Sequence, residues 1–250
     1  MADYREFLRV LSHEKPGRAV FFEYALDRAL AEQLVWRRGD TLWATENARV
    51  QTLADAAAVS GFDCAVVQLS FEDGFPALKG LRLREGMKLA AGLSVPIFDP
   101  APYEALAKEE TVCAVILRNV PCGTPENYRQ LAAAVHRQGK PCIWADDSKT
   151  PIPLSELTGC SFDGIHLTEA RNRPVELLWK QWNDRWALLG DTRFSWLIRQ
   201  KPRDILDYCT GLQQLTHGKS YAFGSGNPEG KPIPYLSYAA ILSAYIRGQS

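Results

Sequence analysis

Residues 112–147 read VCAVILRNVPCGTPENYRQLAAAVHRQGKPCIWADD and contain the unit that decides the fold, a strand, a helix and a second strand. The runs VCAVILRN (112–119) and PCIWADD (141–147) are short and almost continuously apolar, which is typical of strands covered on both faces. Between them, Thr124 before a proline marks a helix start, and Gly139 marks its end. The stretch therefore predicts a βαβ unit and a parallel sheet.

The same alternation extends over the rest of the chain. Further short apolar runs are RAVFFEY (18–24), CAVVQL (64–69), SVPIF (94–98), FDGIHL (162–167), WALLGD (186–191) and YAFGSGN (221–227). Helical apolar spacing is found over 4–11, 26–36, 47–60, 170–182, 205–215 and 236–244. Eight strand candidates alternating with helices predict an α/β fold, a single (β/α)8 TIM barrel spanning residues 1–250. A doubly wound open sheet is the alternative, although FFEYALDR (21–28) lacks the glycine-rich phosphate turn usual after its first strand.

The composition is that of an ordinary globular protein and excludes several classes of partner. The chain has 250 residues, 46% hydrophobic and 23% charged, with 29 basic and 29 acidic side chains. This balance gives no net field, so neither nucleic acid nor a membrane is expected as a partner. No apolar run approaches the roughly 18 residues of a membrane span, and the acidic start MADYREFLRV is unlike a signal peptide, so a cytoplasmic location is expected.

The cysteines and histidines give no sign of a disulfide framework or a zinc site. The six cysteines are scattered without paired spacing, and none of the four histidines lies near one at ligand spacing. No metal is therefore expected.

Polar residues close or follow every predicted strand. Catalytic groups of a (β/α)8 barrel lie at the carboxyl ends of its strands, so these residues would surround one polar mouth. In chain order they are Glu23, Tyr24, Glu72, Asp73, Asp99, Arg118, Asn119, Asp146, Asp147, His166, Glu169, Asp191, Arg193, Ser225 and Asn227. Strand ends meet water in any protein, so the prediction depends on the whole set rather than on one member.

Two strand ends can be analysed further. Side-chain alternation puts Ile143, Ala145 and Asp147 on one face, and because Trp144 is bulky it should face the helices, so Asp147 should point into the mouth. His166 is the only histidine near a strand end.

In the last loop, GSGNPEGKPIPY (224–235), glycines flank Ser225 and would let the backbone approach a ligand closely.

Four stretches, taken in order, resemble parts of the uroporphyrinogen decarboxylase superfamily, whose members are (β/α)8 barrels. They are YREFLRVLSHEKPGRAVFFEY (4–24), KPCIWADDSKTPIPLSELTGCSFDGIHL (140–167), WALLGDTRFSWLIRQKPRDILDYC (186–209) and YAFGSGNPEGKPIPYLSYAAILSAYIRG (221–248). The resemblance implies the same fold as the strand count does. It also implies one of the superfamily's activities, which are porphyrinogen decarboxylation, zinc-dependent methyl transfer to thiols, and methyl transfer between small substrates and corrinoid proteins.

Departures from the family pattern separate these activities. The zinc-dependent members carry a His-x-Cys pair on the fifth strand and a Cys in the eighth-strand loop, and the positions that resemble these hold Ala145, Asp147 and Ser225. Without soft ligands, a zinc-activated thiol is disfavoured. True decarboxylases gather arginines near the N-terminus and place an Asp after the second strand, where this chain has Glu23 and Ser70.

The resemblance therefore implies zinc-independent methyl transfer between a small polar substrate and a corrinoid, with a corrinoid protein as the implied partner. The catalytic candidates, which would polarise the leaving atom, are Asp147, Glu169, His166 and Glu23. The candidates for substrate binding are Tyr24, Arg118, Asn119, Asp191, Ser225 and Asn227. Two alternatives stay open: cofactor-free decarboxylation of a porphyrinogen or a smaller carboxylic acid, and a barrel without catalysis that binds a partner.

Overall fold

A computed structural model describes residues 2–93, 98–118, 123–145, 151–217, 219–227 and 230–247. The helices are α1 (Tyr4–Leu11), α2 (Arg28–Val35), α3 (Glu46–Val59), α4 (Ala101–Lys108), α5 (Pro125–His136), α6 (Leu154–Leu157), α7 (Val175–Trp182), α8 (Phe194–Leu197), α9 (Pro202–Thr216) and α10 (Tyr235–Arg247). The strands are β1 (Cys64–Leu69), β2 (Lys88–Leu93), β3 (Val112–Arg118), β4 (Cys142–Ala145), β5 (Gly164–His166), β6 (Ala187–Leu189) and β7 (Tyr221–Ala222). Strands and helices alternate through most of the chain, as the sequence predicts.

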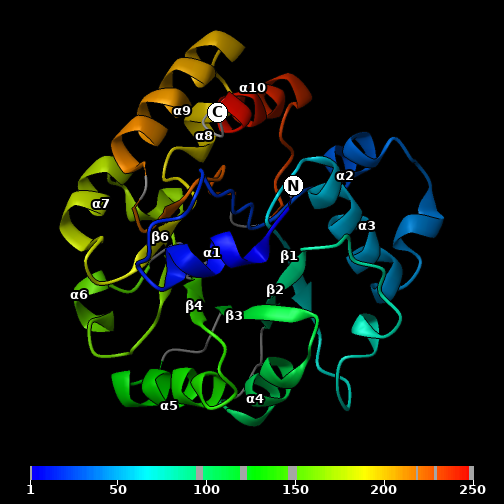
Figure 1. The fold of residues 1–250 in the computed structure, drawn as a ribbon, viewed down its shortest axis with the longest axis vertical. Helices are drawn as coiled ribbons and strands as arrows, with labels where there is room; N and C mark the ends of the chain where they lie inside the picture. The colour runs from blue at the N-terminus through cyan, green and yellow to red at the C-terminus, as the bar shows by residue number, and fades with distance from the viewer. Residues whose placement is uncertain are drawn as a thin grey trace.

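The seven strands form one parallel sheet in which each strand pairs with the next along the chain. The sheet curls, and the helices other than α1 lie around its outside, as Figure 1 shows. The first predicted strand, 18–24, is reduced to one bridge beside β7, in which Phe22 N donates to Phe223 O (2.7 Å) and Phe223 N donates to Val20 O (2.8 Å). Within the described residues no pairing joins this segment to β1, so the sheet is a half-barrel of seven strands rather than a closed ring of eight.

One strand lies beside its predicted position. The run 94–98 was the expected third strand, but the strand found there is β2, which ends at Leu93, and residues 94–97 lie outside the described residues. Its sequence KLAAGL is poor in β-branched residues and so gives a weak strand signal. This strand has little room for larger side chains. Ala90 and Ala91 are fully buried, and a Cβ at Gly92 would collide with the Gln68 amide.

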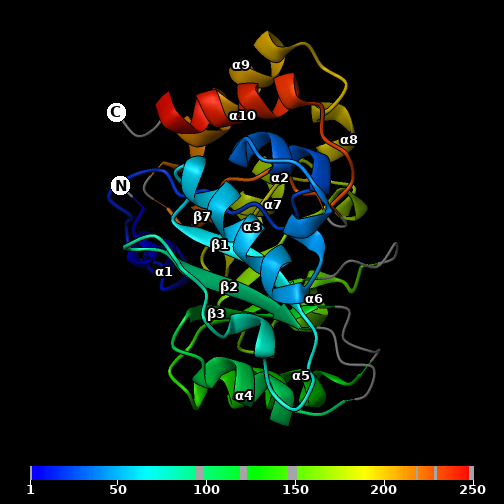
Figure 2. The same ribbon diagram turned by 90° about the vertical axis from the view of Figure 1, so that its right-hand side faces the viewer.

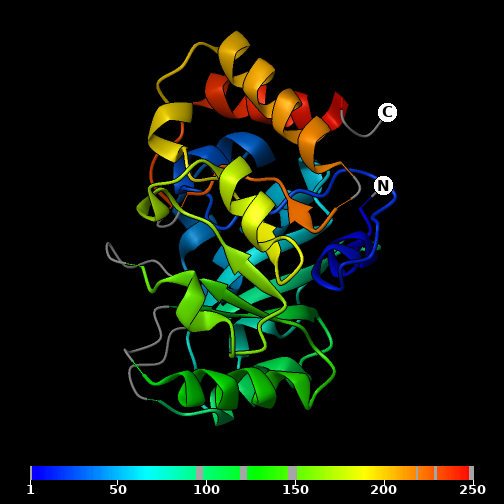
Figure 3. The ribbon, with the colours of Figure 1, turned by 90° about the vertical axis from the view of Figure 1, so that its left-hand side faces the viewer.

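Helix α1 covers the inner side of the sheet at the amino ends of the strands. Its buried residues Phe7, Val10 and Leu11 pack against inward-facing strand residues such as Ile143. The Leu11 side chain lies where a Cβ at Gly164 would be, 2.8 Å away, so that glycine makes room for the helix. Figures 2 and 3 both show α1 against one end of the sheet. The opposite end, at the carboxyl ends of the strands, is left for a site.

The outer face of the sheet packs on the surrounding helices through large aromatic side chains. Trp144 contacts Tyr128 of α5 at 4.8 Å between ring centroids, whereas Ile143 and Ala145 belong to the inner cluster. The predicted alternation on β4 is therefore confirmed for its described residues, which end at Ala145. No helix in the described part of the chain is long and apolar enough to cross a membrane.

Candidate active site

Four polar side chains occupy the inner face of the sheet near the carboxyl ends of the strands: Tyr24, Gln68, Arg118 and His166. Cys64, Ile116 and Phe22 belong to the apolar cluster on the inner face of the sheet. Because side chains alternate along a strand, Gln68, Arg118 and Tyr24 point to the same face as these three residues, respectively. Arg118 and His166 both pair in register with Ala145, which brings β3, β4 and β5 to the same level here. We call these four residues the inner mouth.

His166 is a buried imidazole without a hydrogen-bond partner. It is 1% exposed, its ring stacks on Tyr24 with centroids 4.0 Å apart, and neither ring nitrogen is bonded. Gly190 leaves space for it, since a Cβ there would lie 3.3 Å from the ring. Burial, with smaller repulsion from Arg171 and Arg118, lowers the pKa of His166 to about 3. The ring is therefore neutral near pH 7 and offers one N–H donor and one acceptor nitrogen.

Gln68 is a functional candidate that sequence reasoning missed. Both polar atoms of its side-chain amide are buried and have no hydrogen-bond partner. An unpaired buried polar group costs about 1–3 kcal/mol, which a bound ligand can recover. The available signal was its position in CAVVQL, two residues after Val66 and four after Cys64 on the inward face. The signal is weak because the rest of the run is apolar, which predicts a strand buried on both faces.

Arg118 brings a positive charge to the inner mouth. Its guanidinium carbon lies 5.9 Å from the centre of the Tyr24 ring, which also stacks on the His166 imidazole. Tyr24 itself is 1% exposed. The two predicted binding residues and the predicted catalytic histidine are thus brought together in one stack.

Glu23 and Ser225 form a second buried pair. Ser225 donates through its hydroxyl to Glu23 Oε1 (2.6 Å) and through its backbone N–H to Oε2 (3.2 Å). Alternation puts both on the side of Phe21 and Phe223, which face the outer helices, rather than on the side of Tyr24. Burial raises the pKa of Glu23 to about 7, against the opposing effect of the Ser225 hydrogen bonds.

Asn227 and Asp191 hold loops in place. The Asn227 amide donates to Lys231 O (2.9 Å) and accepts from Lys231 N (3.0 Å), which closes the loop after β7. Asp191 accepts from Arg193 N and from the Tyr208 hydroxyl, each at 2.8 Å. Burial raises the pKa of Asp191 to about 6, although both hydrogen bonds oppose the shift.

Glu169 lies in a 3-10 turn with partners of its own. Its carboxylate accepts from Ser195 N (3.0 Å) and lies 3.8 Å from Lys231 Nζ. Partial burial raises the pKa of Glu169, but the Ser195 hydrogen bonds and the charges of Lys231 and Arg199 outweigh it and leave the pKa lowered. It is therefore an ionised carboxylate. The other two candidates, Asp147 and Asn119, lie outside the described residues.

The glycines around Ser225 allow close approach of the backbone, but to the chain itself. A Cβ at Gly224 would collide with the carbonyl of Phe22, and one at Gly226, where φ is +70°, with the carbonyl of Asp191. These glycines therefore pack the last loop against the neighbouring strand ends. Among the described residues, no group of three or more His, Cys, Asp and Glu side chains could hold a metal ion.

Comparison with solved structures finds similar folds. The chain is similar to a methyltransferase from Methanosarcina mazei, with a TM-score of 0.64, 11% identity and coverage of 99% of both chains. It is also similar to a sugar phosphate isomerase/epimerase from Parabacteroides distasonis, with a TM-score of 0.53, 10% identity and coverage of 93% and 94%. No protein-family model matches the sequence, and no curated protein matches it either. At these identities the likeness shows a TIM-barrel-like fold and nothing finer.

Proposed function

We propose that this chain is a barrel enzyme that moves a methyl group between a small polar substrate and a corrinoid. The supporting observation is the inner mouth, where a neutral imidazole and a primary amide are buried with unpaired polar atoms beside a guanidinium. A folded chain leaves such groups unpaired at a cost, and a substrate that pairs with them removes that cost. The name of the Methanosarcina mazei neighbour and the family resemblance of the sequence support methyl transfer as the reaction class.

The chemistry sets what the protein must supply. In the forward direction a methyl–oxygen or methyl–nitrogen bond breaks, cobalt(I) provides the electron pair for the new methyl–cobalt bond, and the departing heteroatom takes up one proton. The corrinoid is here a second substrate. An oxygen or nitrogen leaving group departs slowly unless it is hydrogen-bonded or protonated as the bond breaks.

The residues of the inner mouth divide this work. His166 and Gln68 would hydrogen-bond the substrate's heteroatom, and Arg118 with Tyr24 would orient the rest of it. Because the pKa of His166 is about 3, its part is a hydrogen bond rather than delivery of a proton. Glu23 lies on the other side of the sheet from the inner mouth, so the proton that the departing heteroatom takes up would come from water.

The direct test mixes the folded chain with cob(I)alamin and a panel of methoxylated and N-methylated compounds, and follows the absorbance change on cobalt methylation. We expect methylation with at least one donor. For that donor, kcat/KM should fall about tenfold or more in His166→Phe, which keeps an aromatic ring but removes both nitrogens, and in Gln68→Leu.

The control is Gln33→Leu, the same change at an exposed position on α2, which should leave kcat/KM unchanged. Absence of methylation across the panel with folded protein would contradict the proposal. Equal activity of both mouth variants and the native chain would show that the reaction takes place elsewhere.

A further inference from the structure

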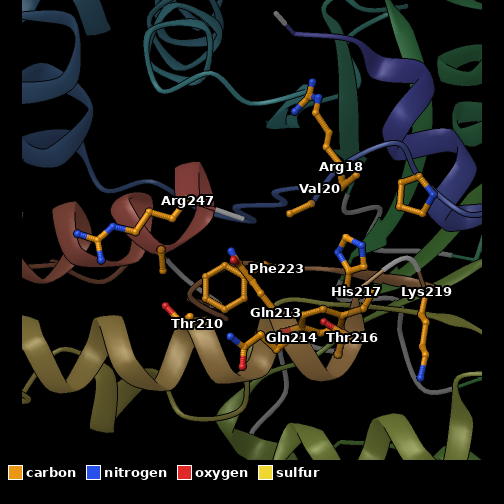
Figure 4. A pocket seen from close by; sticks show the side chains of 14 residues that line it. Arg18, Val20, Thr210, Gln213, Gln214, Thr216, His217, Lys219, Phe223 and Arg247 are labelled. Carbon is orange, nitrogen blue, oxygen red and sulfur yellow. The ribbon is translucent and has the colours of Figure 1, made fainter. Parts of the chain in front are cut away.

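A cavity lies at the other end of the barrel from the inner mouth. It has a volume of about 430 Å³ and lies between α9, α10 and the segment that leads into Val20. Arg18, Ala19 and Val20 lie at the start of the segment 18–24, and Tyr221 begins β7, so the cavity is at the amino ends of these two segments. Its size is within the range of about 300–1,000 Å³ that is usual for small-molecule sites. Figure 4 shows the side chains that line it.

The cavity has an apolar wall and a basic rim. Val20, Phe223 and Ala244 supply apolar surface, and the lining holds four basic residues and no carboxylate: Arg18, His217, Lys219 and Arg247. The whole chain has 29 acidic and 29 basic residues, so the excess of positive charge around this cavity is local to it. In Figure 4 the Phe223 ring and the glutamine side chains lie together in the middle, while Arg18, Lys219 and Arg247 reach outward on different sides.

The basic groups are not equivalent. The Arg18 guanidinium contacts the buried carboxylate of Asp63 and the Tyr245 hydroxyl, which leaves little of its charge for a ligand. Lys219 is exposed, with its ammonium 4.3 Å above the ring of Trp179, and Arg247 lies in the last turn of α10. Lys219 therefore contributes positive charge to the rim, and the charge of Arg247 adds to the positive field there.

We propose that this cavity binds an amphipathic anion, a carboxylate with an unbranched hydrocarbon chain, whose tail lies on the apolar wall and whose head faces the basic rim. The tail would contact Val20 and Phe223 together. These two residues are joined by the hydrogen bond from Phe223 N to Val20 O, so an occupant would bridge the first segment and β7. Because such a ligand binds the folded chain alone, it raises the unfolding temperature.

Calorimetric titration of the full chain with hexanoate, octanoate and 1-octanol tests the proposal. We expect octanoate to bind at submillimolar concentration, about fourfold tighter for each methylene added beyond hexanoate. The neutral alcohol should bind at least tenfold more weakly than octanoate, because it lacks the charge that the rim attracts. Octanoate should also raise the unfolding temperature in proportion to the logarithm of its concentration.

Two kinds of variant locate the site. Thr210→Trp on α9 fills the cavity and should abolish binding, and Gln214→Trp on the same wall serves if the first variant is unstable. Lys219→Glu should weaken octanoate about tenfold, whereas Lys79→Glu, the same charge change at an exposed site in the β1–β2 connection, should not.

No heat and no stabilisation with octanoate up to roughly 5 mM would overturn the proposal. It would also be overturned if the tryptophan variants bound octanoate as tightly as the native chain. Neither outcome depends on methyl transfer at the mouth.

Discussion

The carboxylate of Glu23 and the hydroxyl of Ser225, 202 residues apart in sequence, form a 2.6 Å hydrogen bond in a buried position. Their two segments are also joined one step earlier, through the bridge between Phe21 and Phe223. Ser225 therefore ties the carboxyl end of the first segment to that of β7. The contact between these two segments therefore includes a buried acid that can titrate.

Replacing Glu23 by Gln should change how stability depends on pH. Burial raises the pKa of Glu23 from 4.5 to about 7, so the folded state favours the protonated form. The contribution of this group to the free energy of unfolding is therefore complete below pH 4.5 and is lost as the pH rises through 7. Glu23→Gln should match the native chain at pH 4.5. At pH 8 it should be more stable, by an amount of the order of 3 kcal/mol at most. Urea unfolding at several pH values measures this difference.

The matched control is Glu156→Gln, an exposed carboxyl in α6, which should follow the native pH profile. If Glu23→Gln and the native chain lose stability equally between pH 4.5 and 8, Glu23 is not a buried acid of raised pKa.

A second buried carboxylate should be sensitive to loss of its partner. Asp63 is 0% exposed, accepts from Asp3 N (3.1 Å) and forms an ion pair with Arg18. Burial raises its pKa to about 6, although Arg18 opposes the shift. Arg18→Met removes that opposition and should destabilise the chain by about 3 kcal/mol at pH 8, because it leaves a buried charge unpaired.

The loss should be smaller at pH 5, where Asp63 is protonated in the folded state, and Asp63→Asn in the same background should restore part of it at pH 8. Arg5→Met, which removes an exposed partner of Asp3, should cost less than about 1 kcal/mol. A loss for Arg18→Met that is equal at both pH values would show that lost packing, not charge, is responsible.

Much of the fold was predictable because its signals are local. CAVVQL coincides with β1, and Thr124 caps α5 by accepting a hydrogen bond from Asn127 N, as the Thr-Pro-Glu start predicts. The run 18–24 has the composition of a strand, yet it forms only one bridge. Composition predicts that a segment is extended and buried. The number of backbone hydrogen bonds that it forms depends on how the neighbouring strands are placed beside it, which the local sequence does not determine.

The site was less predictable because burial and side-chain direction depend on tertiary packing. His166 could be selected as the histidine at a strand end, but its neutral state follows from stacking on Tyr24 inside the sheet. Glu23 and Tyr24 were treated as one polar strand end, whereas alternation sends them to opposite sides of the sheet. A polar residue near a strand end thus indicates the mouth without showing which way it points.

Gln68 and Gly92 provide the sharpest test of where the Gln68 amide lies in the inner mouth, because this amide occupies the space that a side chain at position 92 would need. The two are paired in register on β1 and β2, and a Cβ at Gly92 would collide with the Gln68 amide oxygen. Gly92→Ala should therefore destabilise the chain by about 1–3 kcal/mol. In a Gln68→Ala background the same change should cost less than about 1 kcal/mol, a coupling that a double-mutant cycle of urea unfolding measures.

Gly211→Ala is the control for the backbone effect of this substitution, because Gly211 lies exposed in α9 with open space around it. There the change should stabilise the chain by about 0.5–1 kcal/mol, since alanine is the better helix former. Additive costs for Gly92→Ala and Gln68→Ala would mean that the Gln68 amide does not lie over Gly92. The same result would remove Gln68 from the inner mouth and leave His166 as its only unpaired group among the described residues.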